Sequence, residues 1–191
     1  MNKLSLRNYR TFDISVFTVL LVVFEVLAVR AVGWFKEIYS VSLFLSLSLL
    51  VMMRWGAWSA VPIVFGAFAY CWAVGAAWEN YVVYGVGNLF LLGNLLWFLR
   101  GKELVRKGPF LILFVLSGYL FTELGRSLVS LFFGGKFFSA LIGFLGTDLL
   151  NALLALLVLG IAKRQKGLFE DQISYLRSLR QEEKKRDADE V

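Results

Sequence analysis

Several ionisable and amide side chains of this 191-residue chain lie inside long apolar stretches. Carboxylates, a guanidinium group, amides and phenols supply charge and directed hydrogen bonds, a combination that suits the binding of a small polar molecule. An ionisable side chain within a bilayer is costly unless it faces protein or water, so these residues are candidates for a functional interior. The candidate solute-binding residues are Glu25, Trp34, Asn80, Tyr84, Asn88, Tyr119, Glu123, Arg126, Asp148 and Asn151.

Helical spacing puts many of these residues on shared faces. Residues three, four or seven positions apart lie on one side of a helix. The stripes are Tyr81, Tyr84 and Asn88; Tyr119, Glu123 and Arg126; and Asp148 with Asn151. Together with the helix that carries Glu25, four helices are predicted to bring polar groups into one layer, from the middle of a membrane to its outer surface.

Two interpretations of this layer remain open. In one, Glu123 and Arg126 form an internal ion pair and the asparagines hold neighbouring helices together. In the other, the layer surrounds a solute pocket that opens outward, with Trp34 and Trp78 near its mouth. We expect the pocket, because purely structural polar contacts have no reason to gather toward one side of the membrane.

The layer contains more carboxylates than cations. Its ionisable groups are Glu25, Glu79, Glu123 and Asp148 against Arg30 and Arg126. If all are charged, electrostatic attraction favours a cationic or donor-rich solute over an anion. Protonation of the carboxylates would remove this preference.

Six apolar stretches are expected to position these groups. A helical crossing of a hydrocarbon core about 30 Å thick needs about 20 apolar residues. The stretches are Phe12–Val32, Tyr39–Met53, Ala57–Ala77, Trp78–Leu99, Pro109–Phe133 and Phe137–Ala162. They are continuous rather than alternating, which favours helices over a barrel. We therefore predict an all-α integral membrane protein with a bundle of six transmembrane helices.

Composition agrees with this class and limits the domain organisation. Hydrophobic residues make up 59% of the chain, and the mean hydropathy is +0.70. The length allows one membrane domain, residues 1–162, and a charged cytoplasmic tail, residues 163–191. In the tail, Phe169, Ile173 and Leu176 follow roughly helical spacing, which predicts a short amphipathic helix along the inner membrane surface or against a partner.

Basic residues are concentrated at alternate breaks between the stretches. The basic positions are Lys3, Arg7 and Arg10; Arg54; Arg100, Lys102, Arg106 and Lys107; and Lys163, Arg164 and Lys166. Cytoplasmic loops of membrane proteins are enriched in Lys and Arg, so both termini are predicted to be cytoplasmic. An even number of crossings agrees with this, because it returns the chain to its starting side.

Missing residue types exclude several functions. The chain has no histidine and one cysteine, which excludes histidine catalysis, histidine metal ligation and a thiolate cluster. It has no Gly-rich loop followed by Lys-Ser/Thr, so it does not carry an ATP-binding P-loop. We expect no cofactor, no metal and no enzymatic activity. The net charge of +6 reflects membrane topology rather than nucleic-acid binding.

Small residues recur on the third stretch. Gly66, Ala69, Ala73 and Ala77 lie three or four positions apart, which lets backbones approach closely. An internal helix contact is the more common use of such a stripe. Docking to another membrane subunit is the more specific, functional interpretation of the stripe.

Three segments carry a resemblance to a known family. They are Met53-Arg54-Trp55-Gly56-Ala57-Trp58, the run from Tyr81 to Asn88, and Gly167-Leu168-Phe169-Glu170-Asp171-Gln172. With the size, span count and outward polar layer, they make the chain resemble the substrate-binding S component of energy-coupling factor transporters. The resemblance covers the membrane domain as well as the start of the tail.

The resemblance implies a division of labour in a bacterial cell membrane. An S component captures a vitamin or related micronutrient, a membrane coupling subunit holds it, and two ATPases drive the cycle. The family's Ala-x-x-x-Ala docking motif usually lies on the first helix, and Phe12–Val32 lacks it. Its nearest equivalent here is the stripe from Gly66 to Ala77, which is therefore the predicted docking face.

Two other classes are weighed against the importer. A membrane scaffold subunit of an envelope-assembly complex would use its polar groups for stability alone. An intramembrane enzyme would use Glu123 or Asp148 as acid or base. The enzyme ranks last, because neither carboxylate is paired with an obvious nucleophile in the sequence.

Overall fold

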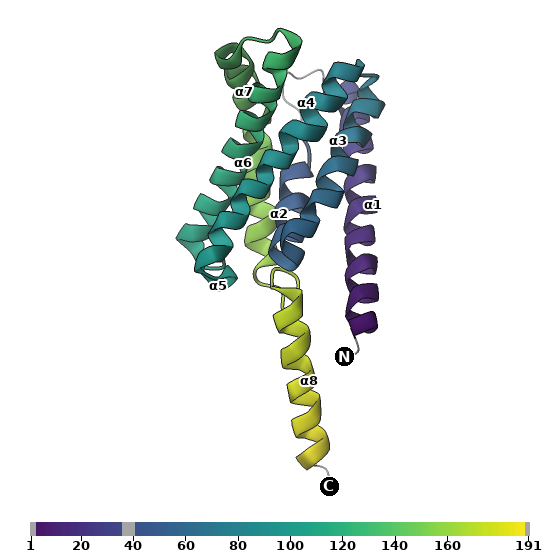
Figure 1. Ribbon diagram of the computed structural model, residues 1–191, viewed down its shortest axis with the longest axis vertical. Helices are drawn as coiled ribbons and strands as arrows, with labels where there is room; N and C mark the ends of the chain where they lie inside the picture. Colours follow the sequence, from purple (N-terminus) through teal and green to yellow (C-terminus); the bar gives the residue numbers. More distant parts are fainter. Residues whose placement is uncertain (1–2, 36–40, 190–191) are drawn as a thin grey trace.

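The computed structural model describes residues 3–35 and 41–189, and these form helices without a strand (Figure 1). The elements are α1 (Lys3–Phe35), α2 (Phe44–Trp55), η1 (Gly56–Ser59), α3 (Ala60–Val74), α4 (Trp78–Asn88), η2 (Leu89–Arg100), α5 (Lys102–Val105), α6 (Gly108–Ser130), η3 (Leu131–Phe133), α7 (Phe137–Ala162) and α8 (Gln172–Asp189). The elements marked η are 3₁₀ helices. The predicted all-helical class is confirmed.

Five helical stretches of the described residues are long and apolar enough to cross a membrane. They are Leu6–Arg30, Phe44–Val74, Trp78–Arg100, Gly108–Phe133 and Phe137–Ala162. Four of them correspond to the first, fourth, fifth and sixth predicted spans. The second and third predicted spans both fall within Phe44–Val74, which contains α2, η1 and α3, and residues 39 and 40 lie outside the described part.

The two halves of that stretch are joined at a glycine. Gly56 has a φ of 63°, a backbone conformation that side chains with a Cβ disfavour, and it ends α2. The short 3₁₀ turn η1 then leads into α3, which lies beside α2 as a separate helix (Figure 1). The twelve residues of α2 rise only about 18 Å, less than the thickness of a hydrocarbon core.

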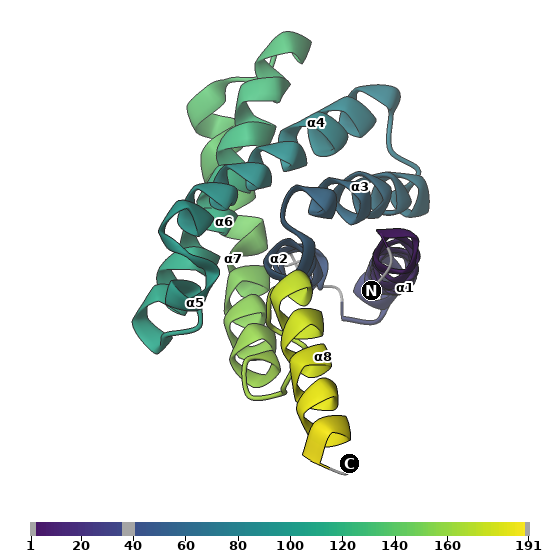
Figure 2. The same ribbon diagram turned by 60° about the horizontal axis from the view of Figure 1, so that its bottom comes forward.

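Helix α2 lies at the centre of the bundle. All of its residues are buried, and α1, α3, α6 and α7 surround it (Figure 2). Leu49, Met52 and Met53 are completely inaccessible and belong to the core that all these helices share. Its central position explains why apolar residues occur on every side of α2 rather than along one stripe.

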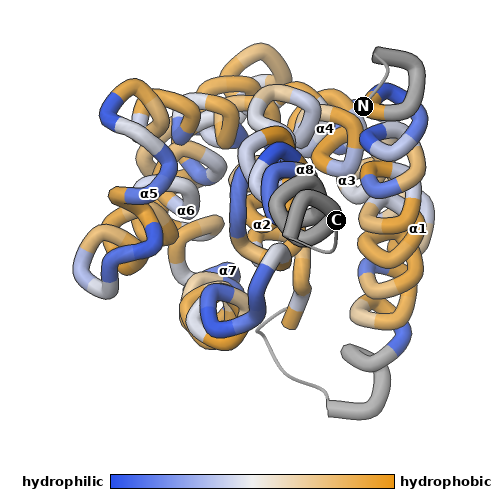
Figure 3. The backbone as a smooth tube through the Cα atoms, turned by 90° about the horizontal axis from the view of Figure 1, so that it is seen from below, coloured by the Kyte–Doolittle hydropathy of each residue, from blue (hydrophilic) through white to orange (hydrophobic). Residues whose placement is uncertain are grey.

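The outer surface of the bundle is also apolar. Trp72, Leu99 and Phe132 are 68%, 83% and 86% exposed, and hydrophobic residues run along most of α1 (Figure 3). Exposed apolar surface of this extent is costly in water and stable against lipid. The structure is therefore that of a multi-pass membrane protein.

The connections divide between two ends of the bundle (Figure 1). The beginning of α1, the short helix α5 and helix α8 lie at one end, and the α3–α4 and α6–α7 connections lie at the other. The α6–α7 connection turns at Gly134, which follows η3 and has a φ of 80°. Helix α7 has the bounds predicted from the sequence.

The tail begins in contact with the bundle. Arg54 of α2 donates from Nη1 to the backbone carbonyls of Gly167 at 2.6 Å and Leu168 at 3.0 Å. The same guanidinium group pairs with Asp13 of α1 at 2.7 Å. Phe169 is fully buried in the main core. Beyond this anchored segment, α8 extends away from the bundle (Figure 1).

Candidate functional site

A cavity of about 40 Å³ lies inside the bundle between α1, α2, α3, α4, α6 and α7. Its walls are Glu25, Ser42, Phe44, Leu45, Gly66, Ala67, Tyr70, Tyr84, Asn88, Tyr119, Thr122, Glu123, Arg126, Asp148 and Asn151. This volume holds a few water molecules. Pockets for drug-sized ligands have volumes of roughly 300–1,000 Å³, so the cavity is small for a vitamin.

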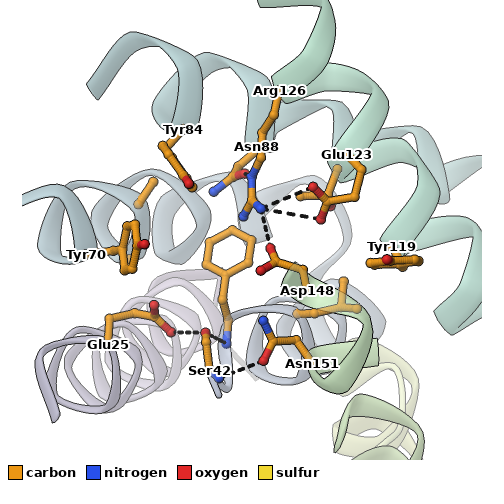
Figure 4. Close-up of a pocket in the computed structure, with 15 residues that line it drawn as sticks. Glu25, Ser42, Tyr70, Tyr84, Asn88, Tyr119, Glu123, Arg126, Asp148 and Asn151 are labelled. Carbon is orange, nitrogen blue, oxygen red and sulfur yellow. Dashed lines mark hydrogen bonds and ion pairs between the residues drawn. The ribbon is translucent and has the colours of Figure 1, made fainter. Parts of the chain in front are cut away.

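Arg126 of α6 is the central charged group of this cavity (Figure 4). Its Nε donates to Oδ1 of Asn88 on α4 at 2.6 Å. Its Nη1 lies 3.3 Å from the carboxylate of Glu123 and also contacts the carboxylate of Asp148 on α7. Because Arg126, Glu123 and Asn88 are at most 5% exposed, these interactions replace water around the charge.

Two glycines allow α4 and α6 to cross closely enough for this network. A Cβ on Gly87 of α4 would lie 2.7 Å from Cα of Arg126. A Cβ on Gly125 of α6 would lie 2.2 Å from the carbonyl oxygen of Gly87. Both distances are too short for real atoms, so the crossing requires glycine on each helix. The backbone of Arg126 is thereby held directly against α4.

Aromatic rings surround the guanidinium group. Its Cζ lies 4.7 Å from the ring centroid of Tyr84, 5.8 Å from that of Phe144 and 6.0 Å from that of Phe44. The Tyr70 and Tyr84 rings are 5.2 Å apart. Rings at these distances attract a cation through their quadrupoles, most strongly where water is excluded. The cavity is thus an environment that favours positive charge.

Glu25 of α1 lies on the other side of the cavity (Figure 4). It is 3% exposed, and one carboxylate oxygen accepts a hydrogen bond from the Ser42 hydroxyl at 2.5 Å. Ser42 in turn accepts a bond from the Phe44 amide at 2.9 Å and donates its own amide to Oδ1 of Asn151 at 2.8 Å. This chain of bonds links α1, the segment before α2, and α7.

Tyr119 lines the cavity but uses its hydroxyl to join two helices. The hydroxyl donates to the backbone carbonyl of Leu145 on α7. Thr122, one turn further along α6, donates back to the carbonyl of Gly118 at 2.9 Å. These two residues therefore shape the wall of the cavity while their hydroxyl groups are already bonded.

Eight of the ten sequence-predicted site residues line this cavity: Glu25, Tyr84, Asn88, Tyr119, Glu123, Arg126, Asp148 and Asn151. Asn80 is an exception, since it is exposed near the start of α4 and its backbone carbonyl lies 3.6 Å from Sγ of Cys71. The side chain of Trp34 lies outside the described residues.

Sequence reasoning missed part of the wall. The additional lining residues are Ser42, Phe44, Leu45, Gly66, Ala67, Tyr70 and Thr122. Two of them left a signal in the spacing: Tyr70 is four residues after Gly66, and Thr122 is three residues after Tyr119. Helical spacing gave no such signal for Ser42, because Ser42 lies in the segment before α2 and bonds Glu25 and Asn151 from there.

The small-residue stripe of α3 divides between interior and surface. Gly66 packs against α1, where a Cβ would come within 2.7 Å of the Leu21 side chain. Ala69 is buried and Ala73 is half-buried, but α3 ends at Val74, and Ala77 is an exposed residue just before α4 rather than part of the α3 face. Gly66 is thus part of an α1–α3 contact, and docking to another subunit stays a prediction for Ala73 and Ala77.

The chemistry offered by the site is recognition through charge and hydrogen bonds. Within residues 3–35 and 41–189, no three His, Cys, Asp or Glu side chains are grouped as metal ligands. The cavity presents three carboxylates, one guanidinium group, two amides and three phenols. Comparison with models of protein families, with curated proteins and with solved structures finds no match to this chain.

Proposed function

We propose that this protein is the solute-binding membrane subunit of an ATP-driven importer of the energy-coupling factor type. It captures a vitamin or related small micronutrient. The observation that carries the proposal is the meeting of ionisable side chains from α1, α6 and α7 around one internal cavity, with Asn88 of α4 as a further wall. Ionisable residues within membrane spans that face an internal cavity are by default candidates for a substrate or ion pathway.

The proposed topology has six crossings with both termini in the cytoplasm. In it, α2, together with the preceding residues 41–43, makes one pass, and α3 makes the next. The basic positions Arg54, Lys102 and Arg106 lie near the end where α1 begins and α8 starts. Under the positive-inside tendency this end faces the cytoplasm. The connections between α3 and α4 and between α6 and α7 then face outward.

Capture of a vitamin-sized solute requires the cavity to enlarge. The interactions that close it are identifiable: Arg126 of α6 contacts Asp148 of α7, and the Ser42 amide bonds Asn151 of α7 at 2.8 Å. Both involve α7. Movement of α7 away from α6 and α2 would therefore widen the space without disturbing the α4–α6 crossing.

Import by such a subunit depends on partners. The chain carries no P-loop, so ATP hydrolysis belongs to separate ATPase subunits, which a membrane coupling subunit connects to this one. The half-buried Ala73 near the end of α3 and the exposed Ala77 just before α4 are the proposed docking face for the coupling subunit. The bilayer of a bacterial cell membrane is the proposed location.

A second candidate is a membrane scaffold with no solute. It is favoured by the internal pairing of Arg126 with Glu123 and Asp148 and by the small cavity volume. In this case Glu123→Gln and Asp148→Asn change stability but leave nutrient uptake by cells unaltered. In the importer, the same substitutions reduce uptake.

The direct test is a ligand search on the purified full-length protein. Native mass spectrometry is expected to detect a co-purifying small molecule, and thermal unfolding in detergent is expected to shift upward with one member of a set of B vitamins and their precursors. The proposal fails if no compound co-purifies and none of the set raises the unfolding temperature.

A further inference from the structure

The charged groups of the cavity are unevenly paired. On one side of the cavity, the Arg126 guanidinium group is the cation that pairs with the Glu123 and Asp148 carboxylates, and it also bonds Asn88. On the other side, Glu25 is 3% exposed and accepts its bond from a neutral hydroxyl, that of Ser42. Among the described residues, no lysine or arginine lies within 4.0 Å of the Glu25 carboxylate as an ion-pair partner.

A buried carboxylate without a counter-ion is unfavourable. The cavity walls hold three carboxylates and a single cation, so the lining as a whole has an excess of negative charge when these groups are ionised. A cation placed beside Glu25 would remove this imbalance, and an anion would increase it. The charge arrangement therefore selects the sign of the ligand.

The walls beside Glu25 also suit a cation. In the view of Figure 4, Tyr70 lies next to Glu25 and Tyr84 lies next to Arg126 on the same side of the cavity, and the two rings are 5.2 Å apart. Tyr84 already faces the Arg126 guanidinium group at 4.7 Å. Tyr70 is half-buried and no ion is stacked on it among the described cation–ring contacts.

We propose that the cavity binds the positively charged nitrogen group of a small organic cation, with the Glu25 carboxylate as its counter-ion and Tyr70 as its ring contact. This inference rests on the proposed solute-binding function and adds the chemical class of the solute. Ser42 and Asn151 hold Glu25 in place through the bonds described above. The cavity volume of about 40 Å³ matches a single ammonium or guanidinium group rather than a whole vitamin, so the rest of the solute lies in the space that opens.

The test compares charged probes with neutral probes of the same shape. Methylguanidinium is paired with methylurea, and ethylammonium with ethanol, on the full-length protein in detergent at constant ionic strength. The cations are expected to raise the unfolding temperature with a saturable concentration dependence. The neutral partners are expected to have no such effect.

Variants assign the effect to the cavity. Glu25→Gln is expected to weaken cation binding by roughly 30-fold or more, and Tyr70→Leu by roughly threefold to tenfold. Glu79→Gln is the matched control, because Glu79 is a half-buried carboxylate on α4 that does not line the cavity. If Glu25→Gln does not fold, Tyr70→Leu decides the question.

Three results would overturn the inference: no stabilisation by either cation, equal stabilisation by the neutral partners, or unchanged binding in Glu25→Gln and Tyr70→Leu. Failure of the importer proposal can be told apart from failure of the cation-site proposal. Cation binding through Glu25 without solute uptake by cells refutes import and retains the cation site. Uptake of a neutral or anionic solute that is unaffected by Glu25→Gln refutes the cation site and retains import.

Discussion

Gly125 of α6 lies directly against Gly87 of α4: a Cβ on Gly125 would be 2.2 Å from the Gly87 carbonyl oxygen and 2.6 Å from Cβ of Phe90. The next residue, Arg126, bonds Asn88, the residue after Gly87, at 2.6 Å. On each helix, the glycine of the close crossing is therefore followed directly by a residue of the polar network: Arg126 on α6 and Asn88 on α4.

Gly125→Ala is expected to destabilise the protein by about 1–3 kcal/mol, because α4 and α6 must separate to admit the methyl group. Gly143→Ala is the matched control. Gly143 is also inside a long helix, but a Cβ there meets no atom within 4 Å, so the change should range from neutral to about 1 kcal/mol stabilising. Denaturant unfolding in detergent measures both. Equal effects would contradict the tight crossing.

Arg126→Met is expected to cost about 3–5 kcal/mol, because it removes the cation that contacts the buried Glu123 carboxylate and the half-buried Asp148 carboxylate. Arg126→Lys should recover only part of this loss, since an ammonium group lacks the fork that reaches Asn88 and both carboxylates together. Arg100→Met, at an exposed arginine without an ion pair among the described residues, serves as the control. A loss in Arg126→Met no greater than in that control would show that the network does not stabilise the fold.

Arg54→Gln is expected to release the start of the tail. The substitution removes the guanidinium donors to the Gly167 and Leu168 carbonyls, so trypsin should cleave the 163–167 segment roughly tenfold faster or more. In the control variant Arg7→Ala, at an exposed position on α1, trypsin should cleave the 163–167 segment at the same rate as in the unsubstituted protein. If Arg54→Gln were cleaved as slowly as the control, the burial of Phe169 and the ion pairs of Glu170 and Asp171 would account for the anchoring without Arg54.

Low pH is expected to loosen the same segment. Partial burial acts to raise the pKa of Asp171, but the bonds from the Lys102 ammonium group and from Ser174 outweigh it, and the pKa lies below its ordinary value of 3.8. A carboxyl group with a lowered pKa stabilises the folded state above the unfolded pKa and loses that contribution as the pH falls below about 4. At neutral pH its contribution is fully present.

The measurement is the anisotropy of a fluorophore on a cysteine introduced at Ser178, an exposed position of α8. Cys71 is buried, so labelling is selective. Anisotropy should fall as the pH drops from 5 to 3, spanning the carboxyl range of about pH 4. In Asp171→Asn the step should be smaller. An identical pH profile in that variant would assign the transition to other carboxyl groups.

Much of the fold could be predicted from the sequence because hydropathy and helical periodicity are local properties. The run Phe137–Ala162 became α7 with the same bounds, and the stripe Tyr119, Glu123 and Arg126 faces one cavity, as its spacing indicates. Asn80 departs from this pattern. It lies near the start of α4, where the helix has not yet reached the cavity, and depth along a helix cannot be read from spacing alone.

What only the tertiary structure decided concerns distances between helices. The central place of α2, the bonds of Ser42 to Glu25 and Asn151, and the clamp of Arg54 on the tail join residues far apart in the chain. Their positions follow from helix rotation and crossing, which depend on small steric details such as Gly87 and Gly125. The sequence by itself determined a helical membrane protein with a polar interior. The volume of that interior and the unequal pairing of its charges were decided by packing, because a cavity is the space that many simultaneous contacts leave unfilled.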